Sequence, residues 1–282
     1  MEVLHLTECG LTNLATCLPE MLFSYFVSIL NAALQGVLDV VYAMMTSSVN
    51  VSLFEPLWQV MVYVLSLFYG LFLLSAGFNF MISGYNASKR ENAKAWIANI
   101  FFMVLSVQAS YFLYDTMIGL AGTLTGSVIN IIDPDFFLVN TSNFASVGLE
   151  LVYVMPYLSI LVFTMLLLGL RYIFLLFGVL FVPFAAFFYF IPPLRSYGKL
   201  ILNVLLVLAF VPFFMAITLF GVSKMSSLLM FGGNSILAAS LGFLAIDLML
   251  IIATVFAIIK AAFGVLGTDV GRVAKAAVKF LV

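Results

Sequence analysis

Two charged side chains stand alone in long apolar stretches of the sequence, and they are the residues best placed to do chemistry. Arg171 is the only charged residue between positions 151 and 191, and Asp247 lies near the centre of the apolar run 237–259. A charge at the centre of a membrane helix costs about 2.5 to 3.5 kcal/mol on insertion scales, so it must be paired or hydrated. The sequence therefore predicts an intramembrane charge pair between Arg171 and Asp247. Such a pair could hold helices together or belong to a transport path, whereas an arginine at the membrane surface would only extend to water.

Patterns typical of catalysis or cofactor binding are otherwise few. The sequence has no Walker loop for a nucleotide, and its single histidine, His5, is far from Arg171 and Asp247. His5 with Cys9 and Cys17 could bind a metal, and the two cysteines could form a disulfide in an oxidising compartment. Two small apolar residues on a short helix are the simpler interpretation. We therefore expect a protein that is not an enzyme and that uses no cofactor and no metal.

The composition places these residues in a membrane. Hydrophobic residues make up 65% of the 282 residues, charged residues make up 8%, and the mean hydropathy is +1.24. Such a chain has too few polar groups to cover a soluble globule. We predict an all-α, polytopic transmembrane helix bundle of the cytoplasmic membrane, with about six to seven membrane helices and an amphipathic C-terminal helix. No polar stretch is long enough to form a second domain.

Six parts of this one membrane domain can be distinguished, with a loop at 46–56 between the second and the third. These are a polar N-terminal segment (1–20), an amphipathic helix (21–45), a helical hairpin with a basic tip (57–118), an external loop (119–148), the core spans (149–259) and a basic amphipathic C-terminal helix (260–282). Ser88 and Glu91 form a capping-box pattern, so the second helix of the hairpin should begin near Lys89.

The amphipathic helix 21–45 carries a polar stripe. Its members recur every three or four residues, which places them on one helical face: Ser24, Ser28, Asn31, Gln35 and Asp39. The stripe has no lysine or arginine, which argues against simple binding to anionic lipid. It could line a water-filled pore, or neighbouring helices could satisfy it, and both interpretations stay open.

Two prolines lie within the apolar runs that follow. Pro183 comes twelve residues after Arg171, and Pro212 is in the middle of the run 200–222. A proline removes one helical hydrogen bond, and the freed carbonyl needs a neighbour or water at membrane depth. We therefore expect helix breaks at Pro183 and Pro212. A turn with a proline pair and two basic residues lies between them: Pro192, Pro193, Arg195 and Lys199.

This pattern resembles the TrbL-like polytopic channel proteins of conjugative type IV secretion. The shared features are the arginine–aromatic pair Arg171–Tyr172, a proline twelve residues on, a proline-basic turn and another span with a central proline. The resemblance covers residues 165–221, with a weaker echo at 70–118. The richness in Phe and Tyr is also similar to that of the compact archaeal CedA-like DNA-exchange proteins.

The resemblance implies a function and a set of partners. It implies an inner-membrane channel component that helps move DNA or protein across the cytoplasmic membrane. The energy would come from a separate cytoplasmic ATPase, and small pilin-like membrane proteins would be neighbours. The polar stripe and the proline-containing spans further predict that the chain works as an oligomer or within a larger complex, because polar groups at membrane depth need protein or water beside them.

The basic residues predict an orientation, since Lys and Arg near span ends favour the cytoplasm. If residues 151–191 formed two spans that turn at Arg171, six basic residues would lie outside and five inside. If that stretch crosses once, as one long helix or as a span with a re-entrant arm broken at Pro183, nine lie inside and only Lys224 outside. We predict the single crossing. The predicted cytoplasmic contacts are Lys89, Arg90, Lys94, Arg195, Lys199, Arg272, Lys275 and Lys279.

Two other classes of function stay open. An autonomous small-solute transporter or channel would be favoured by two similar halves with matching broken helices, and the sequence shows no such repeat. A scaffold that only anchors partner proteins is the third class.

Overall fold

The described part of the chain consists of helices and short connections, without a β-strand. The computed structural model describes residues 14–47, 49–85, 87–139, 144–225 and 235–281, with side chains of the last helix up to Ile259. The α-helices are α1 (Leu14–Thr46), α2 (Glu55–Ile82), α3 (Ala87–Ile129), α4 (Phe144–Phe190), α5 (Arg195–Met225) and α6 (Ser235–Leu281). The 3₁₀ helices are η1 (Val51–Phe54), η2 (Ser83–Tyr85), η3 (Pro134–Phe137) and η4 (Pro192–Leu194).

All six α-helices in this described part are long and apolar enough to cross a membrane. A span needs about 20 apolar residues, and each helix contains at least that many in a continuous stretch. The predicted all-α fold class is therefore confirmed, and the protein is a multi-pass membrane protein.

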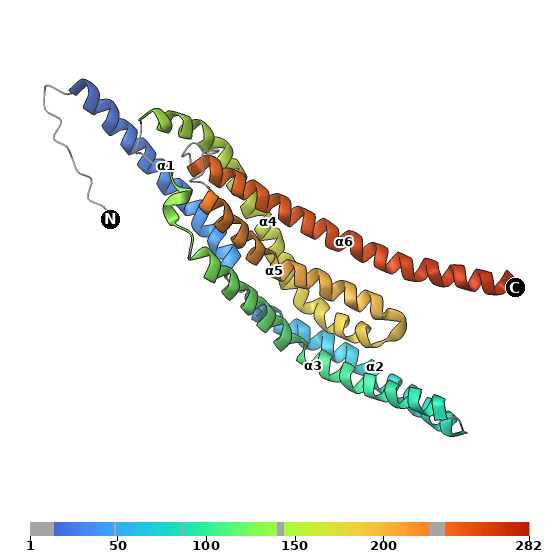
Figure 1. Cartoon of the computed structure of the whole chain (residues 1–282). Coiled ribbons are helices and arrows are strands. Elements are labelled where there is room, and N and C mark those ends of the chain that lie inside the picture. The colour runs from blue at the N-terminus through green and yellow to red at the C-terminus, as the bar shows by residue number, and fades with distance from the viewer. Residues whose placement is uncertain (1–13, 48, 86, 140–143, 226–234, 282) are drawn as a thin grey trace.

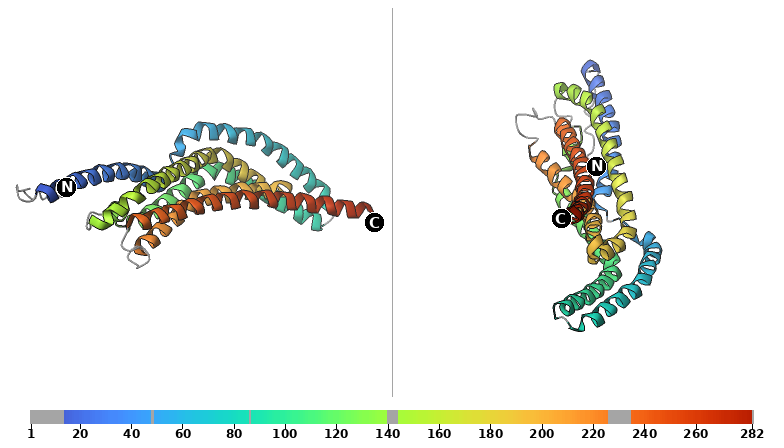
Figure 2. Two further views of the ribbon diagram at one scale, coloured as in Figure 1. Left: turned by 90° about the horizontal axis from the view of Figure 1, so that it is seen from above. Right: turned by 90° about the vertical axis from the view of Figure 1, so that its right-hand side faces the viewer.

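The helices form an elongated bundle with two different ends. α1 and α2 follow each other in the same direction, α3 returns beside α2, and α4, α5 and α6 then alternate in direction (Figure 1). The α2–α3 connection, the α4–α5 turn and the C-terminal end of α6 lie at one end, which we call the basic end (Figure 2). The start of α1 and the α3–α4 connection lie at the opposite end.

α4 is the central helix of the bundle. It packs against α1, α2, α3, α5 and α6, and its buried side chains belong to three hydrophobic clusters that follow one another along its length. Tyr157 and Leu161 lie in the first cluster, Leu175 and Val179 in the second, and Phe187 in the third. Every other α-helix therefore contacts α4.

α4 passes through Arg171 without interruption. It is continuous for 47 residues and contains Pro156 and Pro183, which agrees with the long-helix form of the predicted single crossing and excludes a turn at Arg171. The helix breaks predicted at Pro183 and Pro212 are wrong, because α5 also runs through Pro212 as a helix. Proline is tolerated inside membrane helices when neighbouring groups satisfy the carbonyl that it frees.

The predicted external loop 119–148 is wrong at both of its ends. α3 continues to Ile129 and α4 already begins at Phe144. Gly122 is buried within α3, so packing against neighbouring helices outweighs the weak helix propensity of glycine there. In the remaining connection, η3 turns back into the bundle and buries Phe137, which is 1% exposed, among side chains of α1, α4 and α6.

The other predicted helices are present and longer than expected. The amphipathic helix 21–45 belongs to α1, and the hairpin 57–118 is the pair α2 and α3. α3 begins at Ala87, two residues before the predicted start at Lys89. The last span and the basic segment 260–282 share one helix, α6, up to Leu281.

Candidate functional site around Arg171

Arg171 is buried between α4 and α5, with 6% of its surface exposed. Its Nε donates a hydrogen bond to the backbone carbonyl oxygen of Leu208 at 2.7 Å, and an Nη nitrogen donates to that of Ala209 at 3.2 Å. Both acceptors lie on α5 in the turn that precedes Pro212. The guanidinium therefore joins α4 to the proline-containing turn of α5.

The position of Pro212 explains why the Leu208 carbonyl accepts from a side chain. A helical carbonyl normally accepts from the N–H four residues later, and for Leu208 that residue is Pro212, which has no N–H. An unsatisfied carbonyl in hydrocarbon costs several kcal/mol. Because arginine has five N–H donors in a planar fork, one side chain can serve two adjacent carbonyls. Arg171 thus replaces the backbone N–H donor that α5 lacks at Pro212.

A second polar anchor lies one helical turn further along α4. The Tyr114 hydroxyl on α3 donates to the backbone carbonyl of Leu175 at 2.8 Å. The tyrosine reaches this carbonyl because Gly178 has no side chain: a Cβ there would collide with the Tyr114 hydroxyl and lie 2.7 Å from Leu205 Cδ2. α3, α4 and α5 therefore meet around Gly178, two helical turns beyond Arg171 on α4.

The predicted pair of Arg171 with Asp247 is not formed between the described side chains. Asp247, on α6, is 5% exposed and is hydrogen-bonded to Thr164 of α4, while its Oδ1 has no partner among the described residues. Thr164 precedes Arg171 by seven residues, which is about 10 Å along a helix. Arg171 bonds to carbonyls at its own level, and the carboxylate lies two turns away. The site is therefore two separate polar centres on α4.

The residues of the polar stripe on α1 also lie in two different environments. Asn31 Nδ2 donates to the carbonyl of Val139 at 3.1 Å, and the Val139 N–H donates to Asn31 Oδ1 at 2.9 Å, so this amide holds the α3–α4 connection against α1. The other members of the stripe are exposed on the surface of the bundle: Ser24, Ser28, Gln35 and Asp39.

The described basic side chains predicted to face the cytoplasm gather at the basic end. Arg90, Lys94, Arg195 and Lys199 are exposed there, at the α2–α3 connection and the α4–α5 turn (Figure 1). Arg90 lies over the ring of Phe80 at 6.0 Å, and Arg195 lies over Tyr189 at 5.0 Å. The side chains of Lys89, Arg272, Lys275 and Lys279 fall outside the described residues.

The described side chains contain no group of three or more His, Cys, Asp or Glu residues that could hold a metal ion. His5 and Cys9, and the side chain of Cys17, are outside the described part of the chain. The buried polar groups of the two centres on α4 are a guanidinium, hydroxyls, backbone carbonyls and one carboxylate. These groups can hold helices together or bind ions and protons.

Sequence analysis did not identify Tyr114, Gly178 or Thr164 as site residues. Tyr114 and Gly178 have the spacing of ordinary packing residues, so nothing in the sequence distinguishes them. Thr164 could have been found, because it lies two turns before Arg171 on the same helical face. No family model, no curated protein and no solved structure matches this chain.

Proposed function

We propose that this protein is a membrane channel component of a conjugation-like type IV secretion or DNA-transfer machine, which helps move DNA or protein across the cytoplasmic membrane. A separate ATPase supplies the energy. One observation carries the proposal: Arg171, a member of the TrbL-like pattern, donates to the backbone carbonyl of Leu208, which is the carbonyl that Pro212, another member of the pattern, leaves without its helical donor. Two members of the pattern that are linked through one carbonyl are more informative than the same residues dispersed in an apolar background.

The exposed polar stripe of α1 supports work within an assembly. Ser28, Gln35 and Asp39 are exposed on a helix that is apolar enough to cross a membrane. Polar side chains at that depth need protein or water beside them. Pilin-like helices or further copies of the chain would provide such neighbours, and an assembly would offer a wider path for DNA than one helix bundle.

The basic end supports an orientation in which it faces the cytoplasm. Basic residues near span ends favour that side, and there they could contact the acidic surface of an ATPase. In a variant without Cys9 and Cys17, a membrane-impermeant maleimide should label a cysteine at Asp135 in intact cells, and label one at Asn92 only after lysis. The reverse result would invert the orientation.

The experiment that tests the function combines purification with a transfer assay. The tagged protein, extracted gently from its native membrane, should co-purify with a cytoplasmic ATPase and small pilin-like proteins, while an unrelated polytopic protein from the same membrane should not. Deletion of the gene should abolish DNA transfer, and the intact gene should restore it. Normal transfer in the deletion strain, or a purified monomer that moves a small solute unaided, would contradict the proposal.

A second candidate is an autonomous small-solute transporter, and the buried Asp247 favours it. Intramembrane carboxylates commonly mark proton or ion pathways, and this one has a free oxygen among the described contacts. Solute uptake by liposomes containing only this protein would support the candidate if Asp247→Asn abolished uptake. Leu248→Ala, at the exposed neighbouring position, is the matched control.

A further inference from the structure

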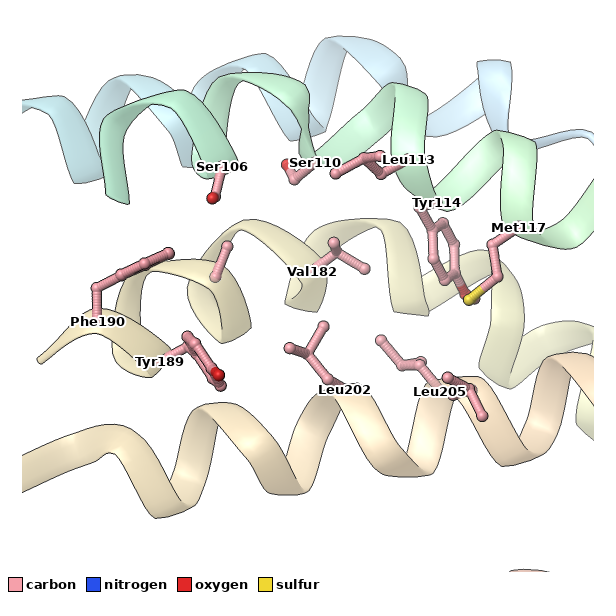
Figure 3. Close-up of a pocket in the computed structure, with 12 residues that line it drawn as sticks. Ser106, Ser110, Leu113, Tyr114, Met117, Val182, Tyr189, Phe190, Leu202 and Leu205 are labelled. Carbon is pink, nitrogen blue, oxygen red and sulfur yellow. The ribbon is translucent and has the colours of Figure 1, made fainter. Parts of the chain in front are cut away.

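An apolar slot runs along α4 between α3 and α5 near the basic end. It has a volume of about 380 Å³, and Figure 3 shows α3 and α5 as its two walls, with α4 behind them. The lining is almost entirely carbon. The Ser110 hydroxyl is engaged, because it accepts from Trp58 Nε1 at 3.0 Å and donates to the carbonyl of Val107 at 2.7 Å. The slot therefore suits a hydrocarbon chain better than a polar solute.

The inner end of the slot is closed by the contacts around Gly178. Tyr114 donates to the Leu175 carbonyl, and Leu205 packs against Gly178 from α5. The outer end is marked by Tyr189, eleven residues further along α4, so the slot extends for about 16 Å parallel to the helix. A slot of this length and apolar lining has the form of a groove for one extended hydrocarbon chain.

The mouth of the slot is basic. The Arg195 guanidinium lies 5.0 Å from the centre of the Tyr189 ring and is hydrogen-bonded to that side chain. Lys199 follows one turn later on α5, and both basic residues are exposed. Gly198 holds this turn against α4, since a Cβ there would lie 2.5 Å from the Tyr189 backbone nitrogen and 2.6 Å from the Ala185 carbonyl oxygen.

We propose that this slot binds an anionic phospholipid, with an acyl chain along α4 and the phosphate group bound by Arg195 and Lys199. The apolar lining matches the chain, and the paired positive charges match the headgroup. Basic pockets between membrane helices are suited to anionic headgroups, and tyrosine is favoured at the same depth. A zwitterionic lipid would fill the slot without this charge complementarity, so the site selects by headgroup charge.

The test uses Trp58 as a reporter. The chain has two tryptophans, so Trp96→Phe leaves only Trp58, whose indole is bonded to Ser110 in the wall of the slot. Delipidated protein in detergent micelles is titrated with phosphatidylglycerol or phosphatidylcholine that carry brominated acyl chains, which quench nearby tryptophan. Quenching should need roughly tenfold less phosphatidylglycerol, since each basic residue near an anionic headgroup adds attraction.

Two sets of variants locate the site. Arg195→Gln with Lys199→Gln should bring the two lipids to equal midpoints, whereas the matched pair Arg90→Gln with Lys94→Gln, at the same end but away from the slot, should keep the difference. Ala186→Leu should weaken quenching by both lipids because it fills the slot from α4. Ser106→Phe fills it from α3, and it replaces Ala186→Leu if that variant does not fold.

Three results would overturn the proposal. They are equal midpoints for both lipids in the parent protein, a phosphatidylglycerol preference that persists without Arg195 and Lys199, and a preference that survives filling of the slot. A thermal melt of each variant shows that a lost preference does not come from unfolding.

Discussion

The α4–α5 pair and the α2–α3 hairpin are both antiparallel helix pairs, yet they are held together in different ways. In the described spans, 44% of the most apolar part of α4 is buried against 17% of that of α2. α4 and α5 are joined by the Arg171 hydrogen bonds and by backbone contact at Gly198. α2 and α3 are joined by Trp58–Ser110 and by aromatic contacts such as Phe72–Trp96.

This difference indicates two roles within one chain. Backbone contact and charge-assisted hydrogen bonds tolerate little change in geometry, so α4 and α5 form a core of defined shape. The exposed apolar side chains of α2 and α3 can face lipid or the helices of a partner with equal ease. We expect substitutions in the first pair to unfold the protein and substitutions in the second pair to affect its assembly.

The largest effect on stability is expected from Gly198→Ala on α5, with the same substitution at Gly70 on α2 as its control. Gly198→Ala places a methyl group 2.5 Å from a backbone nitrogen of α4, and we expect it to cost about 3 kcal/mol or more, because the backbone cannot move aside as a side chain can. Gly70→Ala on α2 has nothing within 4 Å of the added methyl and should leave stability unchanged or raise it by up to about 1 kcal/mol, because alanine is the better helix former. Thermal unfolding in detergent measures both. Equal melting temperatures would remove the distinction between the two pairs.

The next largest effect is expected when Arg171 is replaced, and a double variant tests whether Arg171 compensates for the N–H that Pro212 lacks. Arg171→Leu leaves the Leu208 carbonyl without a donor and should cost about 2 to 3 kcal/mol. Pro212→Ala restores an N–H donor to α5, so the double variant should be more stable than the sum of the single effects predicts.

The matched control for this cycle pairs Arg171→Leu with Asp247→Leu. Because the two side chains do not contact each other, their effects should add within about 0.5 kcal/mol. Strong coupling of Arg171 to Asp247, with none to Pro212, would contradict the geometry of the site.

A smaller effect is expected at Asp247 itself. Its Oδ1 has no hydrogen-bond partner among the described residues, and a buried unsatisfied acceptor costs about 1 to 3 kcal/mol. Asp247→Leu should therefore leave stability unchanged or raise it by about 1 kcal/mol, since an apolar residue removes that cost. A lower melting temperature would indicate that the carboxylate has a stabilising partner. Loss of transport at unchanged stability would place the carboxylate in a transport path.

The smallest effect on the isolated chain is expected along the α1 stripe. Gln35→Leu changes an exposed residue and should alter stability by less than about 0.5 kcal/mol, yet it should reduce co-purification of partner proteins. Asn31→Leu, four residues away, removes two hydrogen bonds to Val139 and should cost about 1 to 2 kcal/mol. If Gln35→Leu leaves the assembly intact, the stripe faces lipid or water and contacts no partner.

The sequence by itself determined the class of the protein and the positions of its membrane helices. Hydropathy and length suffice for this, because a bilayer requires apolar runs of a fixed minimum length with all backbone groups bonded internally. The distribution of basic residues also favoured a single crossing of residues 151–191 over a turn at Arg171, but it did not decide between one long helix and a span with a re-entrant arm. Helix ends were less accurate at 119–148, since the glycines that favour a loop are outweighed by packing that a local pattern does not contain.

Only the tertiary structure decided which groups meet. The sequence showed that Arg171 and Asp247 each needed a partner, and that Pro212 frees a carbonyl, but opposite charge suggested the wrong pairing. The sequence places the freed carbonyl at Leu208, four residues before Pro212, but it does not show which side chain reaches that carbonyl. The relative depth of α4 and α5 decides that, and only the tertiary structure contains it. The apolar slot beside Gly178 could not be predicted from the sequence either. It is lined by α3, α4 and α5, and the separation of these helices depends on the Tyr114 hydroxyl, on the absence of a side chain at Gly178 and on the packing between them.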